Sequence, residues 1–347
     1  MNKTTHCVGL LRLSLFWLVC AVLCTFLLAS FIQVSGVNNS SRARFGDMVY
    51  GTAYRPYVTR ALVPGIVRGV AALIPASFRG ELNAALVGNP VLSLWLTRFR
   101  VDNSLAIEAI ISWMLMFLSL LGFCAAFRNL LTGVYQIPAL TTDLAIFSAL
   151  LMLLLFIGFG YIYDFTTLFL FSLQYNWMAR SRWKAMLISF PLVCLNKETA
   201  VLLILVLALY GWNRLPRLTL IRYLVGETAI FTVIWLGIEW IFRANPGSAT
   251  EFHFQDHFTI ARQFPFLMLI VALILIGIAA LVVKGWRHKP LFLRWALILL
   301  LPMAGLYVFY GFPLEFRAMY EVYPIIFALA LPSVARNVHA LEVVNTV

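Results

Sequence analysis

The stretch Leu10-LRLSLFWLVCAVLCTFLLASFIQ-Val34 decides what kind of fold this chain adopts. It is too long for the apolar core of a signal peptide, and it has no obvious small-residue cleavage site. Lys3 and Arg12 flank its N-terminal side, as is typical of a segment whose N-terminus lies in the cytoplasm. We therefore expect an uncleaved first membrane helix.

The whole chain has the same character. Of its 347 residues, 62% are apolar and only 12% are charged, and the mean hydropathy is +0.91. An ordinary globular domain carries about 25% charged residues. So few charges cannot cover the apolar surface of a soluble fold, which excludes the soluble, secreted, fibrous and disordered classes. The composition indicates a polytopic membrane protein.

The formal net charge of +12 raises the question of a nucleic-acid partner. Most of the bases, however, lie between apolar runs. In that position they act as topology signals and as contacts for anionic membrane lipids. We expect membrane lipids as partners and no nucleic acid.

Further apolar runs alternate with basic clusters along the rest of the chain. They cover about 105–127, 144–163, 165–179, 185–195, 200–211, 223–242, 264–283, 291–312 and 323–334. The pattern predicts an all-α polytopic membrane helical bundle with roughly eight to ten membrane segments. We expect one integral membrane domain over 1–347, in a bacterial inner membrane, with both termini cytoplasmic.

The mixed stretch 35–104 is expected to form a long structured first outer loop. Its many arginines are tolerable outside because the positive-inside rule weakens in loops longer than about 60 residues. Within it, Val58 to Ile74 has the pattern of an amphipathic helix on the membrane surface. The apolar positions are Leu62, Ile66, Val70 and Leu73, set against Arg60 and Arg68.

Two of the apolar runs, 185–195 and 200–211, are separated by Asn196-Lys197-Glu198-Thr199. At a rise of about 1.5 Å per residue, each is too short to cross about 30 Å of hydrocarbon. They are expected to form either a re-entrant pair or one helix broken within the membrane.

Polar groups at membrane depth are costly, so each is a candidate functional residue. Asp47 follows the first helix in Phe45-Gly46-Asp47-Met48. An acid there is suited to act as a general base toward an acceptor hydroxyl, or to help hold a divalent cation. The alternative is an ion pair with Arg44 or Arg55 that folds the loop.

Lys197 and Glu198 form the least ordinary polar feature. The two charges either neutralise one another, or leave Lys197 free to bind an anionic group such as a phosphate. Asp164, beside Tyr163, stands at the outer end of a segment, and its spacing favours an N-cap of the next helix over catalysis.

Arg317 and Glu321 open the last membrane segment. Their spacing of four residues fits a surface ion pair on a helix. The alternative is that the planar fork of the Arg317 guanidinium binds a phosphate or diphosphate.

Few signals point to a metal or a cofactor. The loop from Glu251 to His257 is rich in potential ligands, but it lacks the spacing of a zinc motif. The five cysteines form no CxxC pair, and P-loop, GxGxxG, GxSxG and HExxH motifs are absent from the sequence. No cofactor is implied with certainty, and a divalent metal ion stays open.

Taken together, these features resemble the polytopic glycosyltransferases of the GT-C fold. The resemblance rests on Asp47, on Tyr54-Arg55-Pro56, on the break Asn196-Lys197-Glu198-Thr199, and on the late pair Arg317 and Glu321. It covers most of the chain in architecture. Members of that group take a sugar from a polyprenyl-phosphate donor on the non-cytoplasmic face.

The resemblance implies that Asp47 is the catalytic base. The chain lacks the Asp-x-Asp or Glu-x-Asp pair of the group, because Gly46 and Met48 flank Asp47. The expected function is transfer of a sugar from the lipid-linked donor to a glycan or other hydroxyl acceptor. The residues expected to bind the donor phosphate and substrate are Arg55, Lys197, Glu198, Arg317 and Glu321, with Asp164 and Arg60 as secondary candidates.

The competing function is a transporter or flippase of a lipid-linked or anionic solute. It shares the need for buried basic residues and broken helices near the membrane midplane. Against it, the chain shows no paired halves with matching interruptions, and the first outer loop is large.

Overall fold

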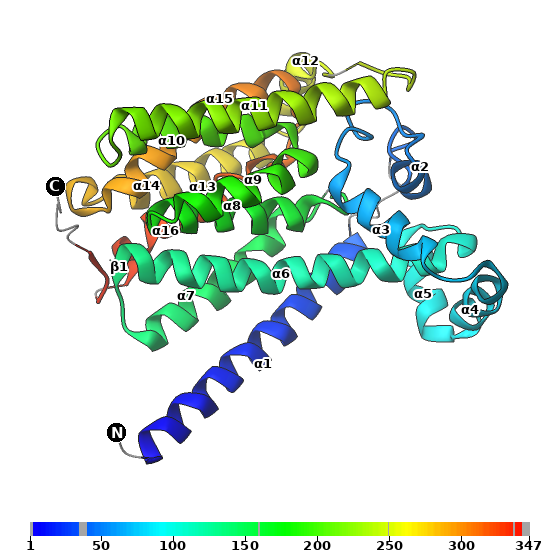
Figure 1. Ribbon diagram of the computed structural model, residues 1–347, viewed down its shortest axis with the longest axis horizontal. Coiled ribbons are helices and arrows are strands. Elements are labelled where there is room, and N and C mark those ends of the chain that lie inside the picture. Colours follow the sequence, from blue (N-terminus) through cyan, green and yellow to red (C-terminus); the bar gives the residue numbers. More distant parts are fainter. Residues whose placement is uncertain (1–2, 35–39, 159, 249, 336, 342–347) are drawn as a thin grey trace.

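A computed structural model describes residues 3–34, 40–158, 160–248, 250–335 and 337–341. For residues 3–8 it describes the backbone only. The described chain is almost entirely helical, with sixteen α-helices, six short 3₁₀ helices and a single two-stranded ladder. The all-α class expected from the apolar runs is confirmed. The long helices lie roughly side by side, and α1 crosses them obliquely (Figure 1).

Six helical stretches are long and apolar enough to cross a membrane. They are α1 (Lys3–Val34), α6 (Ala106–Val134), α7 (Ala139–Met152) with η2 (Leu153–Phe156), α11 (Arg217–Ile241), α13 (Pro265–Val283), and α14 (Leu291–Ala296) with η5 (Leu297–Leu299) and α15 (Leu300–Tyr310). Eighteen residues of helix span about 27 Å, close to the hydrocarbon thickness of a bilayer. The chain therefore has the build of a multi-pass membrane protein.

Shorter helices fill the space between these. They are α8 (Asp164–Ala179), α9 (Trp183–Asn196), η3 (Glu198–Ala200), α10 (Val201–Gly211) and α16 (Tyr323–Val334). The helix α8 packs along α6 and buries polar as well as apolar side chains, among them Thr167, Gln174 and Asn176. It is thus enclosed by protein.

The helices α9 and α10 form a hairpin. Lys197 takes an extended backbone (φ −161°, ψ 139°), which ends α9. The rings of Trp183, at the start of α9, and Tyr210, near the end of α10, lie 6.3 Å apart. The two helices therefore run in opposite directions, with Lys197 and Glu198 at the tip. The two runs therefore pair with each other and do not continue as one broken helix.

The stretch after α1 folds into four helices at one end of the bundle (Figure 1). They are α2 (Phe45–Tyr50), α3 (Leu62–Ala72), α4 (Ala76–Gly88) and α5 (Pro90–Phe99), followed by η1 (Asn103–Leu105). The helix expected over 58–74 is present as α3. It packs through Val63, Val67 and Ala71, whereas Ile66, Val70 and Leu73 of the expected apolar face are exposed. The protein contacts thus use a second apolar face, because both sides of this helix carry apolar residues.

The remaining elements connect the ends of the long helices. They are α12 (Phe254–Gln263), η4 (Trp286–His288), η6 (Phe316–Met319), and the antiparallel strands β1 (Tyr135–Gln136) and β2 (His339–Ala340). The strands lie at the end of the bundle opposite α2 to α5 (Figure 1).

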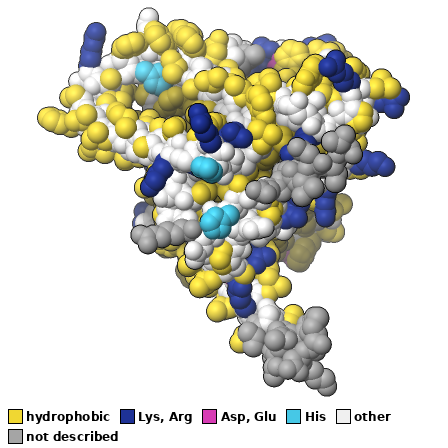
Figure 2. All heavy atoms as spheres, turned by 90° about the vertical axis from the view of Figure 1, so that its left-hand side faces the viewer, with side chains coloured by type: hydrophobic (Ala, Val, Ile, Leu, Met, Phe, Trp, Pro, Cys, Tyr) yellow, Lys and Arg dark blue, Asp and Glu magenta, His cyan; other side chains and the backbone are white. Residues whose placement is uncertain are grey.

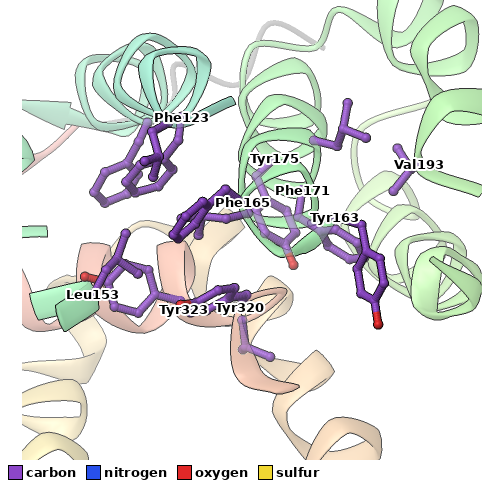
Figure 3. Close-up of a cluster of buried hydrophobic side chains, with 14 of the residues drawn as sticks. Phe123, Leu153, Tyr163, Phe165, Phe171, Tyr175, Val193, Tyr320 and Tyr323 are labelled. Carbon is purple, nitrogen blue, oxygen red and sulfur yellow. The ribbon is translucent and has the colours of Figure 1, made fainter. Parts of the chain in front are cut away.

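Aromatic side chains fill the centre of the bundle and fix α16 and the segment before it. Phe165, Tyr320 and Tyr323 lie together in the core shown in Figure 3. The Tyr323 hydroxyl donates to the Ala149 carbonyl at 2.6 Å, and the Tyr175 hydroxyl donates to the Glu321 carbonyl at 2.7 Å. These bonds hold the segment that carries Arg317 and Glu321 against α7 and α8.

Candidate functional site

A cavity of about 660 Å³ opens beside the tip of the α9–α10 hairpin. Its walls come from the loop before α3, the residues before α8, the hairpin tip, α15 and η6. Charged side chains from several of these segments line it, and Met303 and Leu306 of α15 form an apolar wall. Segments far apart in the sequence therefore meet at this point.

Lys197 lies at the hairpin tip because its extended backbone interrupts the helix. Its Nζ lies 2.6 Å from Oε1 of Glu321, and both side chains are almost wholly buried. The Thr199 hydroxyl donates to the same carboxylate oxygen at 2.8 Å. The second oxygen of Glu321 is buried without a hydrogen-bond partner. A buried charge needs a partner of opposite charge, and Lys197 and Glu321 supply this to each other. Their ion pair therefore fixes the hairpin tip against the segment between η6 and α16.

Arg317, in η6, also lines the cavity and makes two ion pairs. Its Nη1 donates to both carboxylate oxygens of Asp164, at 3.1 and 3.3 Å, and its Nη2 contacts Glu315. The guanidinium also lies over the Tyr161 ring, 4.3 Å from its centroid. Burial alone would lower the pKa of Arg317, but Asp164 and the neighbouring tyrosines outweigh it and raise that pKa.

Arg60, just before α3, connects the hairpin tip to the segment before α8. Its Nη2 donates to Glu198 at 3.0 Å, and its Nη1 donates to the Tyr163 hydroxyl. Burial opposes the charge on Arg60, yet Glu198 and Tyr163 raise its pKa well above the usual value. The Arg60 side chain is 12% exposed and that of Glu198 is 41% exposed. Both side chains line the cavity, and the Glu198 carboxylate is the more exposed of the two.

The rim carries further charges. Arg42 pairs with Glu251 at 2.6 Å, and Nδ1 of His253 lies 2.7 Å from Asp256. Three of the four potential ligands in this loop thus pair with one another or with Arg42, and His257 contacts the carbonyls of Tyr307 and Gly311, at 3.3 and 3.1 Å. Among the residues that the structure describes, no three His, Cys, Asp or Glu side chains are grouped to hold a metal ion.

Three local pairings considered from the sequence do not form. Asp164 does not cap α8, because its carboxylate accepts the Tyr161 backbone N–H at 2.7 Å and pairs with Arg317. Arg317 and Glu321 do not pair across four residues, and Lys197 and Glu198 do not pair with each other. In each case an ion pair forms with a partner more than 100 residues away, and Arg317 also pairs with Glu315.

Six of the eight predicted site residues come together at the cavity. Arg60, Lys197, Glu198 and Arg317 line it, and Asp164 and Glu321 hold two of these from behind.

Asp47 and Arg55 are not among the described residues that line the cavity. The Asp47 carboxylate accepts the Thr52 hydroxyl at 3.0 Å within its own turn. Arg55 donates to the Gly247 carbonyl at 3.0 Å and lies 3.7 Å from Glu239, which ties the loop before α3 to the end of α11. Both residues organise the loops beside the cavity.

Sequence reasoning missed Tyr161 and Glu315. Both contact Arg317, and both stand within three residues of a predicted site residue. The run Tyr161-Ile162-Tyr163-Asp164 was the available signal, because two aromatic hydroxyls beside an acid are unusual at the start of a buried helix.

Comparison of the chain with protein-family models, with curated proteins and with solved structures found no match.

Proposed function

We propose that the chain is a membrane glycosyltransferase that moves a sugar from a polyprenyl-phosphate donor to a hydroxyl acceptor at this cavity. In this proposal the six long apolar helices and the shorter α8, α9, α10 and α16 make up ten membrane segments, at the upper end of the expected eight to ten. The cavity faces the non-cytoplasmic side, and the base-rich opposite end faces the cytoplasm.

The observation that carries the proposal is the convergence of three cations on one cavity with an apolar wall. Arg60, Lys197 and Arg317 come from distant parts of the chain. Buried acids hold Lys197 and Arg317, and the partly exposed Glu198 holds Arg60. Preorganised cations of this kind stabilise the negative charge that develops on a departing phosphate. The apolar wall includes Leu306 of α15, which is 40% exposed. It offers a lipid tail a path from the bilayer.

The acid that we propose as general base is Glu198. Three carboxylates line the described part of the cavity. The Glu198 side chain is the most exposed of them, at 41%, against 20% for Glu251 and 16% for Glu315. The acceptor oxygen would attack the anomeric carbon, and the bond from that carbon to the phosphate oxygen would break. Polyprenyl phosphate would leave with the electron pair, and Glu198 would take the hydroxyl proton. The position of Asp47 outside the cavity is the reason for preferring Glu198.

The test uses the full chain in proteoliposomes with a panel of radiolabelled polyprenyl-phosphate sugars and candidate acceptors. We expect label to pass from lipid to acceptor, and Glu198→Gln to reduce the rate by at least about 100-fold, as for loss of a general base. The matched carboxylate change Asp47→Asn should leave transfer within a few fold. Transfer that survives Glu198→Gln but is lost in Asp47→Asn would return the base to Asp47.

Transport is the second candidate function, and the α9–α10 hairpin is the observation that favours it. Short helices that meet at a charged break are a known way to build a midplane binding site. The same proteoliposomes separate the two functions. A transporter would move the labelled lipid-linked sugar intact across the bilayer without forming product.

A further inference from the structure

A second cavity lies at the opposite end of the bundle. Its volume is about 730 Å³, and it is formed where α13 turns into α14, beside the α10–α11 connection and the β1–β2 ladder. Arg214, Lys284, Arg287, His288 and His339 line it. Among its described lining residues there is no Asp or Glu, and none of these five bases takes part in an ion pair with a described carboxylate.

This distinguishes it from the first cavity, where each cation has an acidic partner. Figure 2 looks onto this end of the bundle and shows Lys, Arg and His side chains with very little acid among them. Basic side chains gathered around a hollow, with no acid among the described residues that line it, produce a positive potential that favours an anion.

A buried lysine fixes the shape of the cavity. The Lys289 Nζ donates to the carbonyls of Leu281 and Val282, at 2.7 and 2.6 Å, and lies 3.4 Å from the Ser333 hydroxyl. These carbonyls belong to the last turn of α13 and have no partner further along the helix. Lys289 therefore locks the end of α13 to the turn before α14 and to α16. Its amine is used for structure, which leaves ligand binding to the exposed Lys284 and Arg287 and the half-buried Arg214.

The surroundings point to a ligand that also has an apolar part. Leu291 lines the cavity and is 37% exposed, and Val283 and Val334, at the ends of α13 and α16, are 63% and 72% exposed. The half-buried Trp286 stands between Lys284 and Arg287 in the sequence. Aromatic rings and bases next to exposed apolar residues are typical of the boundary between head groups and acyl chains.

We propose that this cavity binds the phosphate head group of an anionic phospholipid, separately from the lipid-linked substrate of the first cavity. Arg214, Lys284 and Arg287 contact the phosphate oxygens, and the acyl chains lie along Leu291, Val283 and Val334. Basic pockets between membrane helices on the cytoplasmic side are suited to such head groups. The same phosphate chemistry would accept a free phosphate, so the test separates the two sources.

The experiment incorporates the full chain into vesicles of equimolar phosphatidylglycerol and phosphatidylcholine. Lipid retained after mild extraction is counted by native mass spectrometry. The wild type should retain phosphatidylglycerol in preference to phosphatidylcholine. In the variant R214Q/K284Q/R287Q, the preference should fall by about 100-fold, at roughly fivefold for each base removed near a membrane surface.

The matched control is R182Q/K184Q/R222Q, which removes two arginines and one lysine, as in the test variant. These three residues are exposed and are not among the described residues that line the cavity. It should keep the wild-type preference. Equal losses in the two triple variants would show that diffuse surface charge is responsible and would overturn the site. Displacement of the lipid by excess inorganic phosphate would overturn the lipid as ligand. Each variant must elute as a single folded species in size-exclusion chromatography. Sugar transfer is measured in parallel and should be unchanged in both triple variants.

Discussion

At the scale of single residues, the pair of Lys197 and Glu321 shows how one contact serves both folding and chemistry. Both side chains are buried, and their ionised groups lie 2.6 Å apart. Replacing Lys197 by Met leaves the Glu321 charge without compensation, which costs about 3–5 kcal/mol when one partner of a buried pair is lost. We expect Lys197→Met to lower the free energy of unfolding by that order and to abolish sugar transfer, as measured by urea unfolding in mild detergent and by the transfer assay.

The second variant separates the two roles. In K197M/E321Q the buried charge is gone, and the Gln side chain still accepts from Thr199. Most of the lost stability should return, whereas transfer should stay absent because the cation that faces the phosphate is missing. Lys184→Met, an exposed lysine, is the control and should change stability by less than about 0.5 kcal/mol. Recovery of transfer in the double variant would show that Lys197 has only a structural role.

At the scale of elements, the bundle depends on the close packing of α6 against α8. A Cβ added at Gly122 in α6 would lie 2.8 Å from two ring atoms of Phe169 in α8, closer than carbon atoms approach. Small residues at such contacts let membrane helices approach one another. We expect Gly122→Ala to lower the free energy of unfolding by about 1–3 kcal/mol, as in other overpacked cores. Gly277→Ala in α13 has open space around it and is the matched control. Equal stabilities of the two variants would contradict this packing.

At the scale of the whole molecule, the two ends of the bundle differ in chemistry and, in our proposal, in compartment. Asn213 and Ala244 are exposed and stand just beyond the two ends of α11, which is apolar enough to cross the membrane. We expect Ala244→Cys to react with an impermeant maleimide from outside intact cells, and Asn213→Cys to react only after permeabilisation, because bases near short loops stay in the cytoplasm.

The background for this labelling has Cys7 replaced by Ser. The four described cysteines, Cys20, Cys24, Cys124 and Cys194, are buried and should not react. Labelling of both sites from outside would mean that α11 does not cross the membrane. The reverse pattern would invert the chain and place the first cavity in the cytoplasm.

The sequence by itself determined the class of the protein and the residues to watch. Long apolar runs such as 10–34 and 264–283 have few ways to satisfy their backbone in lipid except as helices, so the all-α class follows from composition alone. The same reasoning marked Lys197 and Arg317, because a charge in an apolar run must find a partner or a cavity.

Only the tertiary structure decided which partners meet. Spacing favoured near neighbours, yet Lys197 pairs with Glu321 and Arg317 pairs with Asp164. It also separated Asp47, whose carboxylate is used within its own turn, from Glu198, whose carboxylate opens into the cavity. Burial dictates that a charge be compensated, and this demand is visible in the sequence. The choice of partner depends on how helices from distant parts of the chain pack, which no local pattern encodes.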